Sequence, residues 1–363
     1  MRNLYSLQLP PPDVPIRPRL TAAYPRRSRS GPRLTTDANV LNGAPPMSTE
    51  SLTARWESVP AVAVLDRDYD TEILANEVRA LRAGPWNTRR ADISTGLSTI
   101  LPLRSPGGDP SRTDPGGAGP VDHADTPFLA RAPRLARLLR GLPTTLLAAH
   151  LVALAPNIEL KEHRDVKCGP PWGLVRLHIP IITNPAAVMV IDGHEYHWDA
   201  GRLWYGDFNR PHQARNSGDD TRIHLVLDCL LSADLLNLFP PEFRESLPLN
   251  DILLARPARA APWPPRLRFR MPAAFAEWSL EEPASPPDAT VLAELTPGRD
   301  GPVLRLDGQP AFGLVHLGDN EYRFTGWSEE RTVKLESRHV ICRVRLGTSV
   351  RETICLAERP GAS

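Results

Sequence analysis

Apolar positions along the chain follow two different periods, and the change between them divides the sequence. Residues 70–83 place apolar side chains at helical spacing behind Asp70, a residue type that often caps a helix, and so predict an amphipathic helix. A second helix is predicted over about 127–141. From about residue 146 onward, short apolar runs bounded by turn residues indicate strands instead.

The predicted strands follow one another at regular intervals. Residues 146–165 have the apolar density and the Pro-Asn turn of a β-hairpin, and further strands are expected within 173–181, 186–198, 202–208 and 221–231. Short strands at such spacing are typical of a sandwich or a barrel. The chain is therefore predicted to be mainly β, with helices outside the sheets.

Proline and glycine mark the boundaries between segments. The chain has 40 prolines, about twice the usual share of roughly 5%. We expect residues 1–46 to be disordered, or an extension that precedes a true start at Met47, and residues 105–120 to form a surface loop. The main domain is predicted over 50–250, a Pro/Ala-rich linker over 251–289, and a small all-β domain over 290–363.

Charge and composition exclude several classes of protein. The 363 residues carry a net charge of +1, so nothing in the bulk electrostatics points to nucleic acid or to a membrane surface. The arginines of residues 131–140 are interpreted as the solvated face of a helix. No apolar run reaches the roughly 18 residues of a membrane span. Four cysteines without metal-binding or disulfide spacing favour a reducing, cytoplasmic compartment.

One group of residues has the composition of a metal site. His163 and Asp165 are two positions apart, so on a strand they would share one face, and His212 follows after several strands that could return it to them. Two histidines and one carboxylate are the ligand set of non-haem Fe(II) oxygenases. Arg222, ten residues after His212, would provide a bidentate clamp for the far carboxylate of a 2-oxo acid bound to the iron.

Residues 146–229 resemble the aspartyl/asparaginyl β-hydroxylase family of Fe(II)/2-oxoglutarate-dependent dioxygenases. The resemblance includes the RLHIPI strand, the Trp198 to Gly201 turn, Asp207 before the distal histidine, and the turn from Asn216 to Asp219. It implies a double-stranded β-helix, a cupin-like jelly roll, with flanking helices. By the family pattern His163 and His212 are iron ligands, and Arg222 pairs with the distal carboxylate of 2-oxoglutarate.

The resemblance further implies that Arg176 and His178 approach the other end of the co-substrate. It implies an enzyme that uses Fe(II), 2-oxoglutarate and O₂ to hydroxylate an unactivated C–H bond of an amino-acid side chain, free or in a peptide. Asp165 is retained, whereas related halogenases lose this carboxylate, so hydroxylation is favoured over halogenation. Tailoring of a peptide natural product is the expected context.

Two alternatives remain open at this point. One is a metal-dependent cupin enzyme that does not use 2-oxoglutarate, which would have no need of Arg222; the other is a non-catalytic cupin that binds a small ligand. His194 and His197 are interpreted as structural residues of a hairpin edge, and His224 could face the pocket or the core. Asp228 alternates onto the same face as Arg222, but it lies at the far end of the strand and is expected in a turn. The C-terminal β domain is hypothesised to recognise a peptide or carrier partner, or to cover the active site.

Overall fold

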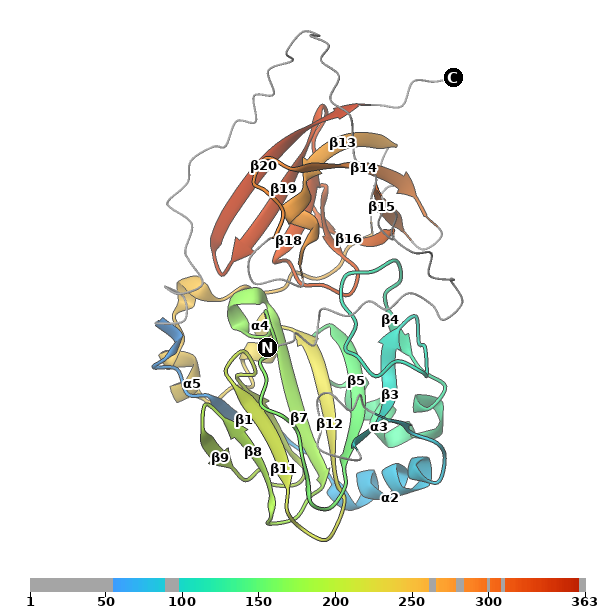
Figure 1. Ribbon diagram of the computed structural model, residues 1–363, viewed down its shortest axis with the longest axis vertical. Helices are drawn as coiled ribbons and strands as arrows, with labels where there is room; N and C mark the ends of the chain where they lie inside the picture. The colour runs from blue at the N-terminus through green and yellow to red at the C-terminus, as the bar shows by residue number, and fades with distance from the viewer. Residues whose placement is uncertain are drawn as a thin grey trace, which may run out of the picture.

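The computed structural model describes residues 55–88, 98–260, 266–278, 284–298, 301–307 and 311–358. Two β structures lie one above the other along the long axis, with the C-terminal strands together at one end (Figure 1). The predicted extension over residues 1–46 lies outside the described residues. Within the described residues, no helix has both the length and the apolar character to span a membrane.

The first β structure consists of two antiparallel sheets. The larger sheet contains, in spatial order, β1 (Val62–Asp68), β10 (Arg202–Gly206), β7 (Leu174–Ile182), β12 (Arg222–Leu230), β5 (Leu146–Leu154), β3 (Ser98–Pro106) and β2 (Asn87–Thr88), with β4 (His123–Asp125) paired to β3. The smaller sheet contains β6 (Ile158–Glu159), β11 (His212–Asn216), β8 (Ala187–Ile191) and β9 (His194–Tyr196). This is the predicted double-stranded β-helix.

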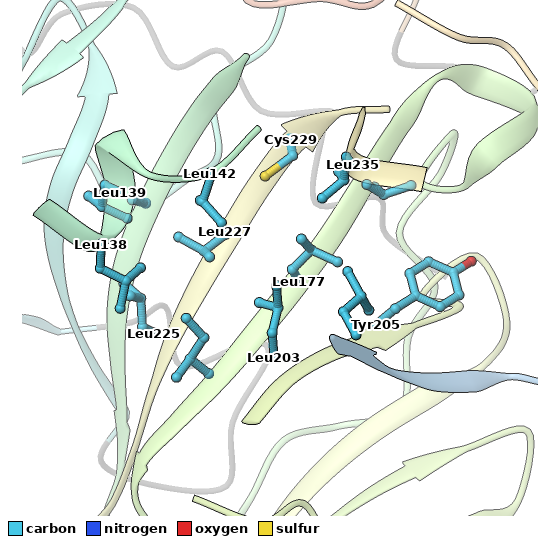
Figure 2. Packing of buried hydrophobic residues seen from close by; sticks show 14 of the residues in the cluster. Leu138, Leu139, Leu142, Leu177, Leu203, Tyr205, Leu225, Leu227, Cys229 and Leu235 are labelled. Atoms are coloured by element: carbon cyan, nitrogen blue, oxygen red, sulfur yellow. The ribbon is translucent and has the colours of Figure 1, made fainter. Parts of the chain in front are cut away.

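The side chains of β12 alternate between the two faces of the larger sheet. Ile223, Leu225, Leu227 and Cys229 belong to the main apolar cluster, which they share with leucines of the helices (Figure 2). Successive strand residues point to opposite faces. The intervening residues of β12, from Arg222 to Asp228, therefore face the smaller sheet, and all of them are buried.

The flanking helices cover the outer face of the larger sheet. α2 (Thr71–Arg82) begins where the sequence predicts, and the Asp70 side chain accepts a hydrogen bond from the backbone N–H of Ile73. The second predicted helix is instead divided into a 3₁₀ turn, η1 (Leu129–Arg131), and α3 (Pro133–Arg140). Proline at the first position of α3 lacks the N–H that would continue the earlier turn. The remaining helices of the core are α4 (Ala233–Leu236), α5 (Pro241–Ser246), and the 3₁₀ turns η2 (Pro170–Trp172) and η3 (Leu249–Asp251).

The second β structure is a closed barrel. Its strands are β13 (Leu267–Pro272), β14 (Thr290–Pro297), β15 (Pro302–Leu306), β16 (Phe312–Gly318), β17 (Glu321–Phe324), β18 (Arg331–Leu335), β19 (His339–Leu346) and β20 (Ser349–Glu358), with the 3₁₀ turn η4 (Ala273–Ala276) after β13. β13 lies inside the range expected to be a linker, and it pairs with both β14 and β20. The barrel thus starts before residue 290, and we propose the domain boundary between β12 and β13.

Two further expectations about local structure are wrong. Residues 146–165 do not form a hairpin: β5 pairs with β12 and β3, whereas β6 pairs with β11 of the other sheet. Successive strands of a double-stranded β-helix change sheets, which local sequence patterns do not reveal. The loop over residues 105–120 is not confined to the surface either, because the carbonyl of Gly119 accepts a hydrogen bond from Gly313 of the barrel.

Candidate metal centre

Three side chains from distant parts of the sequence converge between the two sheets. His163, Asp165 and His212 each offer a ligand atom, and these atoms all lie within 4.8 Å of one another. The two histidines lie 49 positions apart in the sequence. The structure thus brings together the three residues in which the sequence predicts a metal site.

The segment that carries two of the ligands is not a regular strand, contrary to expectation. His163 forms an isolated antiparallel bridge with His212, in which the two residues exchange backbone hydrogen bonds of 3.0 and 2.8 Å. The backbone N–H of Asp165 donates to the carbonyl of Phe208 at 2.9 Å. These three bonds hold the segment against Phe208, which precedes β11, and against His212, the first residue of β11. The three ligands therefore converge because the segment of His163 and Asp165 pairs with residues 208 and 212. They do not converge through the alternation of residues along one regular strand.

Hydrogen bonds define which ring nitrogen of each histidine faces the site. Nδ1 of His163 lies 2.8 Å from the carbonyl of Lys161, and Nδ1 of His212 lies 3.0 Å from the carbonyl of Arg210. A carbonyl only accepts, so each Nδ1 carries the proton and each Nε2 keeps a lone pair. Burial lowers the pKa of His212 to about 4. Both rings, 4.3 Å apart between centroids, are thus arranged as metal-ligating histidines usually are.

Asp165 belongs to a buried network of charges. Its carboxylate, which has no solvent exposure, accepts from Nη1 of Arg176. Nε of the same guanidinium donates to Asp228 at 2.8 Å. Burial raises the pKa of Asp228, while Arg176 opposes that shift. Arg176 therefore holds Asp165 from one side and is itself held by Asp228 from the other.

Asp228 is a functional candidate that sequence reasoning missed. It was expected in a turn, but it lies within β12, directly opposite Arg176 of β7. Its spacing from Arg222 already predicts a shared strand face, and the error was to expect the strand to end before Asp228. An aspartate with a buried position needs such a partner.

Arg222 and His224 form the opposite end of the interior. Nη2 of Arg222 lies 2.8 Å from Nδ1 of His224 and 3.2 Å from the sulfur of Met189 in β8. Burial, and then the charge of Arg222, hold the pKa of His224 well below its usual value. The His224 ring is thus neutral and accepts from the guanidinium. His224, whose orientation the sequence left open, faces the interior.

Aromatic rings line the space between these groups. The ring of His178 stacks on Phe208 at 5.0 Å and meets Trp198 edge to face at 5.2 Å, while Trp198 stacks on Trp204 at 5.5 Å. His178 also lies 3.5 Å from His224 between their Nδ1 atoms. His194 and His197, in contrast, are exposed. The structure thus brings His178 into the interior, with Arg176, and leaves the two hairpin-edge histidines outside it.

A pocket of about 190 Å³ lies next to the ligand-bearing segments. Its lining includes Arg164 and Pro211, which are sequence neighbours of the candidate ligands, together with Trp56 and Trp172. The candidate metal ligands His163, Asp165 and His212 therefore do not line this pocket.

This fold and site define a double-stranded β-helix that carries a candidate metal site. Residues 116–231 match the family described as Aspartyl/Asparaginyl beta-hydroxylase. The matched range contains all three converging residues, as well as Arg176, His178 and Arg222. The resemblance predicted from the sequence is thus confirmed for this segment. No curated protein sequence matches the chain.

Solved structures with similar folds include three oxygenases. A 2OG-Fe(II) oxygenase family oxidoreductase from Burkholderia pseudomallei is 15% identical, with 53% of this chain and 96% of that chain covered and a TM-score of 0.34. A prolyl-4-hydroxylase from Pseudomonas putida is 15% identical, with coverages of 50% and 97% and a TM-score of 0.32. A prolyl hydroxylase from Trichoplax adhaerens, in complex with a hypoxia inducible factor peptide fragment, is 11% identical, with coverages of 55% and 96% and a TM-score of 0.33. All three similarities are low in identity and in TM-score.

Proposed function

We propose that this protein is an Fe(II)/2-oxoglutarate-dependent dioxygenase that hydroxylates an unactivated C–H bond of an amino-acid side chain. The observation that carries the proposal is the convergence of His163, Asp165 and His212 within 4.8 Å, inside a β-helix. Two imidazoles and one carboxylate hold one face of an iron ion and leave the other positions open for a bidentate co-substrate and O₂. The match to the hydroxylase family over the same residues supports this assignment.

The donor set fits Fe(II), because both histidines present a lone pair and Asp165 is held by Arg176. When bound there, Fe(II) with 2-oxoglutarate supplies the oxidative chemistry: O₂ is consumed, 2-oxoglutarate is converted to succinate and CO₂, and the second oxygen atom enters the substrate as a hydroxyl group. The protein's own contribution is to hold the three ligands on one side, to orient the co-substrate and to exclude water.

Arg222 is the proposed partner of the distal carboxylate of 2-oxoglutarate. Its guanidinium is buried beside the neutral ring of His224 and the sulfur of Met189. A planar guanidinium binds a carboxylate through two parallel hydrogen bonds. Met189, which Arg222 contacts, lies in β8 two residues from Ile191, and Ile191 pairs with His212. Arg222 therefore lies close to the candidate ligand His212 along the strands. This placement supports a co-substrate that spans the two.

The proposed substrate is an amino-acid side chain, free or within a peptide, in the tailoring of a peptide natural product. The family description, which names aspartyl and asparaginyl residues, supports this class. The four cysteines are free and buried, which supports a reducing, cytoplasmic setting. The near-neutral charge supports a partner other than nucleic acid.

Anaerobic addition of Fe(II) and then 2-oxoglutarate to the purified full-length chain tests the proposal. We expect a weak visible charge-transfer band from the chelate and, on admission of O₂, succinate in amounts that depend on iron. The Asp165→Ala variant should lose both signals. Iron binding without a band would favour a metal-dependent cupin enzyme that does not use 2-oxoglutarate, and no iron binding at all would favour a non-catalytic cupin.

A further inference from the structure

The barrel and the metal-binding core meet through a buried contact. Residues 325–330, which connect β17 to β18, are buried throughout. Gly326 has a positive φ of 72°, and a side chain there would collide with the carbonyl of Gly117 in the core. On the same side of the barrel, the N–H of Gly347 donates to the carbonyl of Pro171 at 2.9 Å. The barrel is thus packed against loops of the core.

One contact in this junction reaches the ligand-bearing segment itself. Lys167, two residues after Asp165, has its Nζ 3.0 Å from Oε1 of Glu330. Both side chains are almost completely buried, with 6% and 4% exposure. Lys167 also has a φ of 58°, a left-handed conformation that is uncommon for a residue with a side chain. The backbone N–H of Cys168 closes the turn by donating to the carbonyl of Asp165 at 3.3 Å.

Glu330 is in turn held by the barrel. Nε1 of Trp327 donates to its Oε2 at 3.0 Å, and Arg331 pairs with the same carboxylate at 3.2 Å. Arg331 donates to the backbone carbonyl of Phe275 at 2.7 Å and lies 6.0 Å from the centre of the Phe275 ring. The acceptor that meets Lys167 is therefore anchored to the apolar interior of the barrel.

We propose that Glu330 is a positioning residue for the metal centre, which acts through Lys167 to hold the turn that presents Asp165. The proposal deepens the proposed function and rests on it, since it assigns Asp165 as a metal ligand. The turn from Asp165 to Cys168 lies outside the sheets and has few ladder hydrogen bonds of its own. Burying an ammonium group is unfavourable without a partner, so the carboxylate of Glu330 determines where Lys167, and with it the left-handed turn, can lie.

This role differs from that of a mobile recognition module. A barrel that only recognised a peptide or carrier would need no buried ion pair two residues from a metal ligand. Groups around metal ligands orient them, and their loss commonly weakens metal binding by about 10-fold to 100-fold. On this proposal the C-terminal barrel helps to position the metal centre, through the contact of Glu330 with Lys167.

Two measurements on the full-length chain test this role: titration with Mn(II), and hydrogen exchange of the metal-free protein in peptides covering residues 163–169. We expect Glu330→Ala to weaken Mn(II) binding by about 10-fold or more and to accelerate exchange in those peptides. Glu330→Gln, which keeps an acceptor oxygen for Lys167, should fall between Glu330→Ala and the unmodified protein. Glu336→Ala serves as the matched control, because it removes a half-exposed ion pair with Lys334 in the same barrel.

A folded Glu330→Ala protein with unchanged Mn(II) affinity and unchanged exchange over residues 163–169 would overturn the proposal. If Glu330→Ala does not fold, Lys167→Met decides the question from the other side of the contact, without altering the barrel. Failure of the unmodified chain to bind Mn(II) would count against the proposed function instead. The exchange comparison would still show whether Glu330 holds the turn.

Discussion

The core and the C-terminal barrel are both antiparallel β structures, yet their interiors differ in kind. The inward residues of β12 in the core include Arg222, His224 and Asp228. The interior of the barrel is filled with aromatic rings, among which Trp278 lies 4.7 Å from Phe312 and 4.9 Å from Phe324. The same alternation of strand residues thus encloses a polar site in one case and an apolar core in the other.

This difference indicates how the work is divided between the two structures. Buried charges lower stability unless they are paired, so a protein retains them in an interior where they bind or orient something. Packed aromatic rings stabilise a fold and leave no ligand site. Substitutions in the core interior should therefore affect binding and turnover, whereas equivalent substitutions in the barrel interior should affect stability.

The largest expected effect is the loss of turnover in His212→Ala. Removal of one of three metal ligands should reduce iron-dependent succinate formation by about 1000-fold or more, since the remaining two donors no longer enclose one face of the ion. Stability should change far less than turnover, because the substitution removes one buried ring and its hydrogen bond to the carbonyl of Arg210. Succinate assays and thermal unfolding check both parts. Turnover above a tenth of the unmodified rate would show that His212 is not a ligand.

Phe324→Ala should have the opposite effects, with a large loss of stability and little change in turnover. The Phe324 ring is fully buried in the barrel, and its truncation should lower the free energy of unfolding by about 3–5 kcal/mol. Turnover per folded molecule should be retained, because the ring touches none of the metal-site residues. Denaturant titration followed by assay of the folded fraction measures the two quantities. A selective loss of turnover in fully folded protein would break the comparison between the two interiors.

Arg222→Lys should reduce the binding of 2-oxoglutarate more than it reduces the stability of the protein. A lysine keeps the charge but loses the planar pair of donors, so the KM for 2-oxoglutarate should rise by about 10-fold to 100-fold while kcat changes less. The barrel offers a matched control in Arg323, a buried arginine that donates to the carbonyls of Phe324 and Trp327. Arg323→Lys should leave this KM unchanged. Equal effects of the two variants would contradict the assignment of Arg222.

The smallest expected effect is a change in the pH dependence of stability caused by His224. The pKa of this ring is held well below its usual value in the folded protein, whereas the unfolded chain binds a proton there near pH 6.5. The free energy of unfolding should therefore fall as the pH drops below about 6.5, with up to about 1.4 kcal/mol per pH unit from this residue. His224→Gln should remove that part of the slope, measured against the unmodified protein. An unchanged slope in His224→Gln would argue against a buried neutral His224.

Local sequence patterns predicted part of the fold well. The helix α2 and its Asp70 cap follow from apolar spacing and from one residue type. The strand β12 was expected within residues 221–231, and the residue types at His163, Asp165 and His212 predicted a metal site before any geometry was known. The range of β13, in contrast, was expected to be a linker, because the prolines and alanines that flank it conceal a strand whose partners lie on both sides of it in the barrel.

The sequence by itself determined which chemical groups this protein has available and which strand face each regular residue occupies, because side-chain chemistry and the two-residue period of a strand are local properties. Tertiary structure alone decided the pairing of His163 with His212, the network from Asp165 through Arg176 to Asp228, and the contact of Lys167 with Glu330. These contacts join residues far apart in the chain, and their energies depend on burial and on partners that only the folded arrangement supplies.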